Sequence, residues 1–329
     1  MKRKALITGI NGQDGSYLAE LLLEKGYEVY GILKRNSVAE NQTARLDNVY
    51  SLIADNLVYA DMTDMASLVR VLQQIKPDEI YNLAAQSHVR ISFDQPTYTA
   101  NVVALGTLNL LEAIRMICPK AKMYQASSSE CFGNNIDSDG FQRETTPMSP
   151  VSPYGCAKVY GYNIVRNYRK SYNLFASNGI LFNHESNRRG TNFVTSKVAK
   201  EAVKIKHGLS NQLTLGNLDA ARDWGHAKDY VKCMWLILQH NEPDDFCCST
   251  GVSHTVRDLV DYSFKAVGFD NWEPFVKTNE KYMRPEELDV LKGDCSKAKE
   301  ILGWEHEYTF ESMMDEMIEY WDNKLKENI

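Results

Sequence analysis

The chain has 329 residues, of which 43% are hydrophobic and 24% charged, and its formal net charge is −6. This composition is typical of a soluble globular protein, and an acidic balance without basic runs argues against nucleic acid or an anionic membrane as the main partner. The apolar stretches fall short of the ~20 residues that span a bilayer, so we expect a cytoplasmic protein.

Cysteine usage is consistent with that compartment. The chain has seven cysteines, an odd number, and no C-x-x-C pair or Cys/His cluster with metal-ligand spacing. We therefore expect reduced, partly buried thiols and no bound metal.

The N-terminal half alternates short apolar runs with amphipathic segments. The apolar runs predict strands at residues 5–10, 28–33, 56–60, 79–83, 121–126 and 175–182. The segments between them predict helices at residues 15–25, 65–75, 97–116 and 154–172. This order predicts an α/β fold, a Rossmann-like doubly wound parallel sheet with helices on both faces.

The pattern loosens after Phe182. Helices are predicted at residues 194–207, 229–239, 255–267 and 310–326, whereas residues 183–192 are typical of a polar loop and residues 271–287 show little periodicity. We expect a cofactor-binding domain over residues 1–182, with parts of 219–250 returning to it. Residues 183–329 would form a smaller, discontinuous substrate-binding lobe.

A glycine loop lies between the first predicted strand and the first predicted helix. Gly9, Gly12 and Gly15 are spaced G-x-x-G-x-x-G, with Asn11, Gln13 and Asp14 between them. Glycines at this place let the backbone approach a pyrophosphate, which rests on the helix N-terminus. The position after the first strand favours dinucleotide binding over a structural turn.

The end of the second predicted strand bears on the choice between NAD and NADP. NAD-binding units usually place an acid about 20 residues past the glycine loop. Here no acid occurs between Glu28 and Glu40, and Arg35 offers a guanidinium suited to a 2′-phosphate. The alternative is a solvated surface Lys-Arg pair; we favour NADP.

Two later strand ends are further candidates for cofactor contact. Asp61 and Met62 could meet the adenine edge and face. The run Leu83, Ala84, Ala85, Gln86 and Ser87 is mostly small, so a flat cofactor could lie close to it. Either run could instead be strand-end packing.

A hydroxyl followed by Tyr-x-x-x-Lys is typical of a hydride-transfer site on a nicotinamide cofactor. Ser128 follows the strand at 121–126, and Tyr154 and Lys158 are one helical turn apart. Free tyrosine has a pKa near 10, so a base at neutral pH needs a shift of about 3 units. The spacing predicts that the Lys158 ammonium helps to supply it, and Ser128 can steady the substrate hydroxyl. The alternative is an exposed Tyr/Lys helix pair.

Glu130 stands two residues after that hydroxyl. Simple hydride exchange needs no carboxylate there, so Glu130 suggests a second step in which a proton is taken from carbon. The alternative is a surface or capping carboxylate.

Together these motifs resemble extended short-chain dehydrogenase/reductases, and within them the GDP-mannose 4,6-dehydratase family. The similarity runs over nearly the whole chain. It is strongest at residues 8–18 (TGINGQDGSYL), 81–89 (YNLAAQSHV), 125–133, 152–158, 179–189 (GILFNHESNRR), 215–230 and 284–289 (RPEELD). The resemblance implies that Ser128, where the family has Thr, acts with Glu130, Tyr154 and Lys158 in catalysis.

The resemblance also implies a reaction. Tyr154 takes the C4 hydroxyl proton while hydride passes to NADP⁺, and Glu130 then removes the C5 proton as water leaves C6. Hydride returns to C6 and a proton is restored to C5, which gives a 4-keto-6-deoxy sugar nucleotide. His184, Arg189 and Lys158 would join the cofactor contacts. Arg188 and Arg189 form a basic loop, and the resemblance implies that this loop contacts NADP, partly across a subunit interface.

A nucleotide-sugar diphosphate needs cationic groups, and the C-terminal half offers them. Arg222 and Arg284 are the expected diphosphate ligands, since a guanidinium suits such oxygens. Residues that would shape the sugar, ribose and guanine pockets are Ser87, Asn183, Lys197, Leu215, Gly216, Asn217 and Glu287. Any one of these side chains could instead belong to an ordinary ion pair.

Other functions remain open from the sequence. The substrate could be another GDP-sugar, such as a heptose or an amino sugar. An epimerase or reductase of nucleotide sugars shares the glycine loop and the Tyr/Lys pair, and a silent NADP-binding regulator is a third alternative. The resemblance further implies a homodimer or homotetramer, with the helices at 97–116 and 154–172 in the interface.

Overall fold

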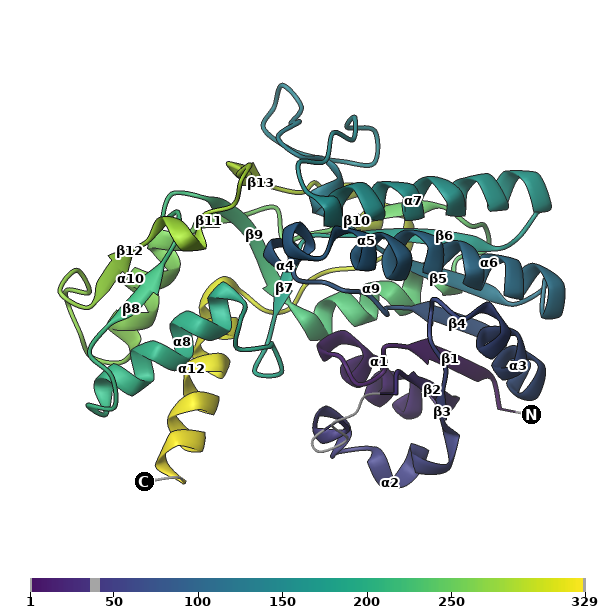
Figure 1. Ribbon diagram of the computed structural model, residues 1–329, viewed down its shortest axis with the longest axis horizontal. Coiled ribbons are helices and arrows are strands. Elements are labelled where there is room, and N and C mark those ends of the chain that lie inside the picture. The colour runs from purple at the N-terminus through teal and green to yellow at the C-terminus, as the bar shows by residue number, and fades with distance from the viewer. Residues whose placement is uncertain (1, 36–41, 328–329) are drawn as a thin grey trace.

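The computed structural model describes residues 2–35 and 42–327. Its centre is a seven-stranded sheet with the order β10-β6-β5-β4-β1-β2-β3 (Figure 1). All its neighbouring strands run parallel. The strands are β1 (Lys4–Thr8), β2 (Glu28–Leu33), β3 (Leu57–Tyr59), β4 (Glu79–Asn82), β5 (Lys122–Ser128), β6 (Ala176–Leu181) and β10 (Asp245–Cys248). The predicted Rossmann-like α/β fold is confirmed.

Helices cover both faces of this sheet. Within β1, Ala5 and Ile7 belong to one buried cluster, and Leu6 belongs to another. Because strand side chains alternate between faces, this pattern requires apolar cover on each side. One face packs against α1 (Gln13–Glu24) and α9 (Ala227–Gln239), and the other against α3 (Met65–Ile75), α6 (Gly106–Ile117) and α7 (Pro153–Tyr172).

The strand order fixes where a ligand binds. From β1 the chain builds outward through β2 and β3, and then crosses back to β4 on the other side of β1. In such sheets the crevice at the carboxyl ends of the strands, where the order reverses, is the binding site. The ends of β1, β4, β5 and β6 therefore supply the candidate site.

The helix predicted at 97–116 is built from three parts. These are α5 (Pro96–Thr99), a π-helical stretch η3 (Ala100–Leu105) and α6. By length and composition the whole run Pro96–Ile117 could cross a membrane, so the expectation that no stretch is long enough is wrong on length. Half of its most apolar window is buried, and α6 packs against α3 and α7. A core helix passes the same test, so the run is weak evidence for a span.

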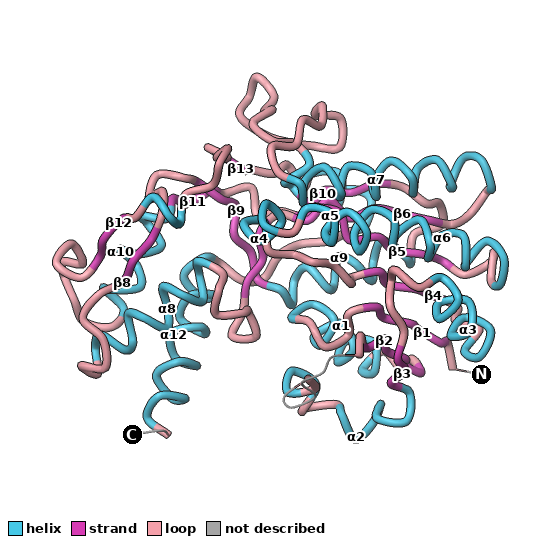
Figure 2. The backbone as a smooth tube through the Cα atoms, in the orientation of Figure 1, coloured by secondary structure: helices cyan, strands magenta, loops and turns pink. Residues whose placement is uncertain are grey.

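The smaller lobe holds three longer helices and two small sheets (Figure 2). The helices are α8 (Val194–Lys206), α10 (Val256–Ala266) and α12 (Phe310–Lys326). One sheet joins β7 (Asn183–Glu185), β9 (Ala221–His226), β11 (Ser253–Thr255) and β13 (Val290–Leu291), and the other pairs β8 (Leu213–Leu215) with β12 (Val276–Thr278). Residues 183–192 and 271–287 therefore contain short strands that the sequence pattern did not predict.

Several shorter elements complete the described chain. They are η1 (Ala44–Leu46), α2 (Tyr50–Ile53), η2 (Ala54–Asn56), α4 (Val89–Asp94), η4 (Ser129–Cys131), η5 (Glu280–Tyr282) and α11 (Ser296–Leu302). Of these, η4 and η5 border the candidate site.

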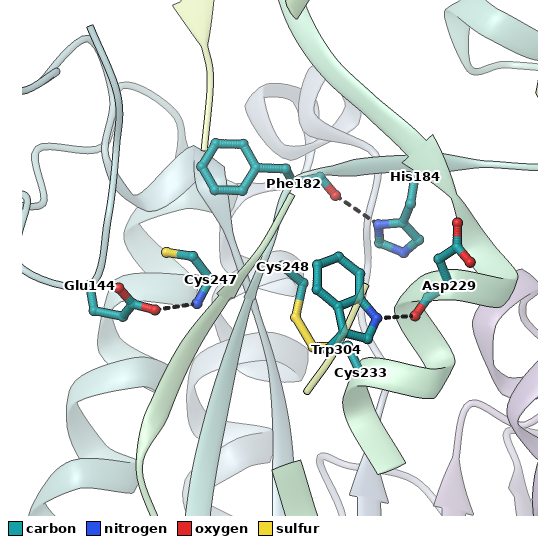
Figure 3. Close-up of a disulfide and its surroundings, with 8 residues drawn as sticks. All are labelled: Glu144, Phe182, His184, Asp229, Cys233, Cys247, Cys248 and Trp304. Carbon is teal, nitrogen blue, oxygen red and sulfur yellow. Dashed lines mark hydrogen bonds between the residues drawn. A yellow bond between two sulfur atoms is a disulfide. The ribbon is translucent and has the colours of Figure 1, made fainter. Parts of the chain in front are cut away.

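The structure joins Cys233 of α9 to Cys248 of β10 in a disulfide (Figure 3). The expectation of reduced thiols is therefore wrong for this pair. Both residues are fully buried, and Trp304 lies beside them, where its indole nitrogen donates to the Asp229 carbonyl at 2.8 Å. The spacing of the cysteines in the sequence could not indicate this pairing, because the two residues meet only where the fold packs α9 against the edge strand β10.

Candidate active site

A cavity of about 1010 Å³ lies at the carboxyl ends of β1, β4, β5 and β6 and extends to the smaller lobe. Most of the predicted site residues line it. The predicted cofactor residues among its walls are Gly9, Asn11, Gly12, Gln13, Asp14, Gly15, Asp61, Met62, Leu83, Ala84, Ala85, Ser87, Lys158, His184 and Arg189. The predicted catalytic and substrate residues there are Ser128, Glu130, Tyr154, Asn183, Lys197, Leu215, Gly216, Asn217, Arg222, Arg284 and Glu287.

The glycine loop forms a cradle that side chains would fill. Gly9 has φ +69°, and a Cβ there would lie 3.0 Å from the Ala84 Cα. A Cβ on Gly15 would lie 2.4 Å from the Gly9 carbonyl oxygen. Helix α1 begins beside the cavity with Gly12 as its N-cap and without a side-chain cap. Unpaired N–H groups at a helix start suit a phosphate, so this loop fits the diphosphate of a dinucleotide.

Two predicted cofactor residues are not among the cavity walls. Arg35 is exposed beyond the end of β2, although its neighbour Lys34 lines the cavity. The Lys34 ammonium donates to the Tyr98 hydroxyl at 2.8 Å and lies 3.4 Å from Oδ2 of Asp61. Lys34 and Tyr98 were not predicted as site residues.

Gln86 supports the loop after β4. Its amide donates to the Thr99 hydroxyl at 3.1 Å and accepts from the His88 N–H at 2.8 Å. His88 itself lines the cavity and packs against Phe193, with ring centroids 5.2 Å apart. A histidine within a run of small residues was the available signal for this wall residue.

The predicted catalytic residues lie on β5, η4 and α7. The Ser128 hydroxyl accepts from the Glu130 N–H at 3.2 Å and so opens the short turn η4. A side-chain hydrogen bond also joins Ser128 to Tyr154. Lys158 lies one turn further along α7, with its ammonium 5.6 Å from the Tyr154 ring centre. The predicted hydroxyl, phenol and ammonium are thus together.

The electrostatics of this group differ from the sequence expectation. Burial raises the pKa of Tyr154, and the hydrogen bond from Ser128 opposes the rise without cancelling it. Burial also lowers the pKa of Lys158 to about 8, and its ammonium donates to the Ala126 carbonyl at 2.6 Å. One hydrogen bond of the Lys158 ammonium thus goes to the backbone and not to Tyr154. The helical spacing alone therefore does not make Tyr154 a base.

Glu130 is a buried carboxylate in the cavity wall, with 6% of its surface exposed. Its Oε1 accepts from Nη1 of Arg284 at 3.0 Å. Its Oε2 is buried and has no hydrogen-bond partner among the described residues. A buried, unpaired carboxylate oxygen is costly, and a proton donor in the cavity would relieve that cost. The position excludes a surface carboxylate and suits a proton acceptor.

His184 links the glycine loop to the end of β6. Its Nε2 lies 2.8 Å from Oδ2 of Asp14. Its Nδ1 lies 2.7 Å from the Phe182 carbonyl oxygen, and Figure 3 shows this second contact. Its ring stacks on Tyr230, with centroids 4.6 Å apart.

The two arginines of the basic loop separate. Arg189 lines the cavity and pairs with Glu185 at 2.8 Å. Arg188 instead reaches α1, where it pairs with Glu20 at 2.6 Å and donates to the Ser16 hydroxyl at 3.0 Å. Arg188 thus braces the loop against the cofactor domain.

The predicted substrate residues bring two guanidinium groups together at one wall of the cavity. The Arg222 guanidinium is buried, and burial followed by the charge of Arg284 lowers its pKa to about 10. Glu287 lies 3.8 Å from Arg222 and 3.7 Å from Arg284. Two adjacent guanidinium groups suit the oxygens of a diphosphate.

The far end of the cavity is formed by the smaller lobe. The Lys197 ammonium donates to the Thr214 carbonyl at 2.5 Å and lies 4.1 Å above the Tyr282 ring. A Cβ on Gly216 would meet the Tyr282 carbonyl oxygen at 2.7 Å, so glycine allows η5 to close over the loop after β8. Tyr282, Lys281 and Trp224 are wall residues that sequence reasoning did not predict.

Acidic and sulfur-bearing side chains do not gather into a metal site within residues 2–35 and 42–327. No group of three or more His, Cys, Asp or Glu residues there is placed to hold an ion.

Comparison with known proteins gives close relatives. The chain is 50% identical to the GDP-mannose 4,6 dehydratase of Cricetulus griseus over 97% of this chain and 91% of that protein. It is 51% identical to the GDP-mannose 4,6 dehydratase of Homo sapiens over 95% of this chain and 90% of that protein.

Solved structures share the fold. The dTDP-glucose 4,6-dehydratase DesIV of Streptomyces venezuelae, solved with NAD bound, has a TM-score of 0.86 at 22% identity and covers 98% of both chains. RMD of Pseudomonas aeruginosa, solved with NADPH, has a TM-score of 0.80 at 20% identity, over 98% of this chain and 100% of that one.

The family comparison spans both lobes of the cavity. The family described as GDP-mannose 4,6 dehydratase matches residues 6–317, from the first strand of the sheet to the last helix of the smaller lobe. This chain belongs to the GDP-mannose 4,6-dehydratase family.

Proposed function

We propose that this chain is an NADP-dependent hydro-lyase that converts GDP-mannose to GDP-4-keto-6-deoxymannose. The observation that carries the proposal is the placement of Glu130 in the same cavity wall as Ser128, Tyr154 and Lys158. Family membership supports the reaction, and the two clustered guanidinium groups support a diphosphate substrate.

The first step is proton transfer at the C4 hydroxyl. Tyr154 takes this proton, with Ser128 as hydrogen-bond partner. NADP held by the glycine loop would supply hydride transfer from C4 and back to C6, and the positive charge of its oxidised ring would favour the Tyr154 phenolate. Since burial raises the pKa of Tyr154, the phenolate needs both that charge and the Lys158 ammonium.

The second step belongs to Glu130. A C4 ketone makes the C5 proton acidic, and the Glu130 carboxylate accepts it while the C6–O bond breaks. Of the two protons then held by Tyr154 and Glu130, one leaves with the C6 hydroxide as water, and the other returns to C5 when hydride reaches C6. Acid–base steps of this kind typically contribute 10²–10⁴-fold each, in rough terms.

Substrate binding falls to the smaller lobe and the loop before β13. Arg222 and Arg284 hold the diphosphate, and Lys197, Asn217 and the Tyr282 ring border the nucleoside. Lys34 and Arg35 follow β2, where the 2′-phosphate that distinguishes NADP from NAD lies in this fold. We further propose a cytoplasmic homo-oligomer.

The test is incubation with GDP-mannose and no added reductant, followed by mass spectrometry of the product. Loss of one water with NADP regenerated is the expected result. A product of unchanged mass would indicate an epimerase, and an unchanged substrate would reject the proposal. A parallel incubation with GDP-linked heptose compares the other substrate class.

A further inference from the structure

The Arg284 side chain contacts Glu130, which the proposed reaction uses as a base, although Arg284 itself is proposed to bind the diphosphate. Its Nη1 lies 3.0 Å from Oε1 of Glu130, a residue 154 positions away in the chain. Arg284 belongs to the loop between η5 and β13. The guanidinium proposed to hold diphosphate is therefore paired here with the carboxylate proposed to take the C5 proton.

The neighbouring Arg222 is held differently. Its Nη1 donates to the carbonyl oxygens of Ala221 at 2.8 Å and Leu288 at 3.0 Å, and 7% of its side-chain surface is exposed. Backbone acceptors on β9 and before β13 fix this guanidinium in place.

Arg284 has partners of another kind. Within the described part of the chain, its side chain contacts the carboxylates of Glu130 and Glu287, and 23% of its surface is exposed. Arg284 can exchange its carboxylate partners for phosphate oxygens. Arg222 would have to give up its hydrogen bonds to backbone carbonyls in order to move. Arg222 is thus the fixed member of the pair, and Arg284 is the member able to change partner.

A diphosphate is the stronger partner. It offers bidentate oxygens on two phosphates, whereas Glu130 offers Arg284 a single oxygen at 3.0 Å. Arg222 adds further positive charge to the same place.

We propose that Arg284 is a positioning residue gated by diphosphate. It pairs with Glu130 until a nucleotide diphosphate draws the guanidinium away, and Glu130 is then free of its cation when the sugar is in place. This inference rests on the proposed function, because it requires that the cavity take a nucleotide diphosphate.

The gating has a thermodynamic consequence. If diphosphate and Glu130 compete for one guanidinium, the coupling is reciprocal, and removing the Glu130 charge must strengthen diphosphate binding. Simple charge repulsion would also strengthen it, but would do so whether or not Arg284 is present. A double-mutant cycle separates the two causes.

The experiment is calorimetric titration of the full-length protein with GDP. Glu130→Gln is expected to tighten GDP binding at least about 5-fold in the wild-type background. In the Arg284→Gln background the same substitution is expected to change the affinity by less than about 2-fold. Equal tightening in both backgrounds would overturn the gating.

Two controls sharpen the result. Arg222→Lys keeps a positive charge at a residue that feels the charge of Glu130 but is hydrogen-bonded to backbone carbonyls, so tightening by Glu130→Gln should persist in that background. Guanosine lacks the diphosphate, and its affinity should be the same with and without the Glu130 charge. If GDP binds but the cycle shows no coupling, the gating alone is wrong. If GDP does not bind the wild-type protein, the proposed substrate class fails and the gating fails with it.

Discussion

Asp14 and His184 form an ion pair between the start of α1 and β7, with Nε2 of His184 2.8 Å from Oδ2 of Asp14. The other ring nitrogen faces the Phe182 carbonyl oxygen at 2.7 Å. Both partners are acceptors, so this geometry favours the imidazolium, in which both ring nitrogens donate.

The pKa directions agree with this geometry. Burial lowers the pKa of His184, but the charge and hydrogen bond of Asp14 outweigh burial and raise it overall. Burial raises the pKa of Asp14, but the charge and hydrogen bond of His184 outweigh that effect and lower it overall. Each partner thus stabilises the charged form of the other beside the cofactor loop.

The pair predicts a pH window of stability. The His184 contribution is complete below its unfolded pKa of about 6.5 and is lost as pH rises through the higher folded pKa. The Asp14 contribution is complete above its unfolded pKa of about 3.9 and is lost as pH falls through the lower folded pKa. We expect His184→Gln to lower the free energy of unfolding most between about pH 4 and 6.5.

Urea unfolding of wild type and His184→Gln at a series of pH values, without cofactor, checks this. The difference in free energy of unfolding between wild type and His184→Gln should narrow as pH rises above the window. The difference in free energy of unfolding between wild type and Asp14→Asn should instead narrow as pH falls below the window. Parallel curves from acid to alkaline pH would show that the pair does not titrate as the geometry requires.

Glu130→Gln should stop water loss and leave the cofactor site intact. The amide keeps the size of the side chain but cannot accept the C5 proton, so dehydration should fall by roughly 10²–10⁴-fold. NADP affinity should stay near that of wild type, because Glu130 bonds to Arg284 and to Ser128 and not to the glycine loop.

Stopped-flow absorbance of NADPH and mass spectrometry of the product together measure this variant. Oxidation at C4 should still be visible as NADPH that persists, because hydride cannot return to C6 before water has left, and no product lighter by one water should form. Turnover like that of wild type would remove Glu130 from the mechanism.

The sequence predicted the elements with a long periodic signal. The observed bounds of β2, α3 and α12 are the predicted ones. The strands β7, β11, β12 and β13 have two or three residues each, which is too short for an alternating pattern to appear. The strands β8, β9 and β10 were missed as well, so length alone does not explain the misses. All of these strands depend on pairing with strands that are distant in the chain.

The same division holds within the site. Gly9, Ser128 and Tyr154 were predictable because each lies in a local motif. The contact between Arg284 and Glu130 was not, because the residues are 154 positions apart and only the folded chain brings them together. The direction of the Tyr154 pKa likewise depends on burial, which spacing cannot reveal.

Gly15→Ala should lower stability. The added Cβ would lie 2.4 Å from the Gly9 carbonyl oxygen and 2.6 Å from the Ile10 Cα, and neither backbone atom can move freely. Overpacking of this kind costs about 1–3 kcal/mol in free energy of unfolding. Thermal or urea unfolding measures the loss.

Gly12→Ala is the matched control for that change. Its Cβ would meet the Gly9 carbonyl oxygen at 3.2 Å, and its φ of −76° suits any residue. We expect a smaller loss of stability but weaker NADP binding, since the methyl group stands at the start of α1, where the diphosphate approaches. Equal stability losses for both variants would contradict the packing argument.

Lys34 and Arg35 should set the preference for NADP over NAD. A hydrogen bond from Lys34 to the Tyr98 hydroxyl raises the pKa of the ammonium, although burial opposes the rise, so the group stays charged at neutral pH. Arg35 follows it directly.

Lys34→Gln and Arg35→Gln should each weaken NADP binding roughly tenfold or more, the cost of a charged hydrogen bond. NAD lacks the 2′-phosphate, so its affinity should change by less than about 2-fold. Dissociation constants for both cofactors decide the matter, and a wild-type protein that binds NAD more tightly than NADP would refute the assignment.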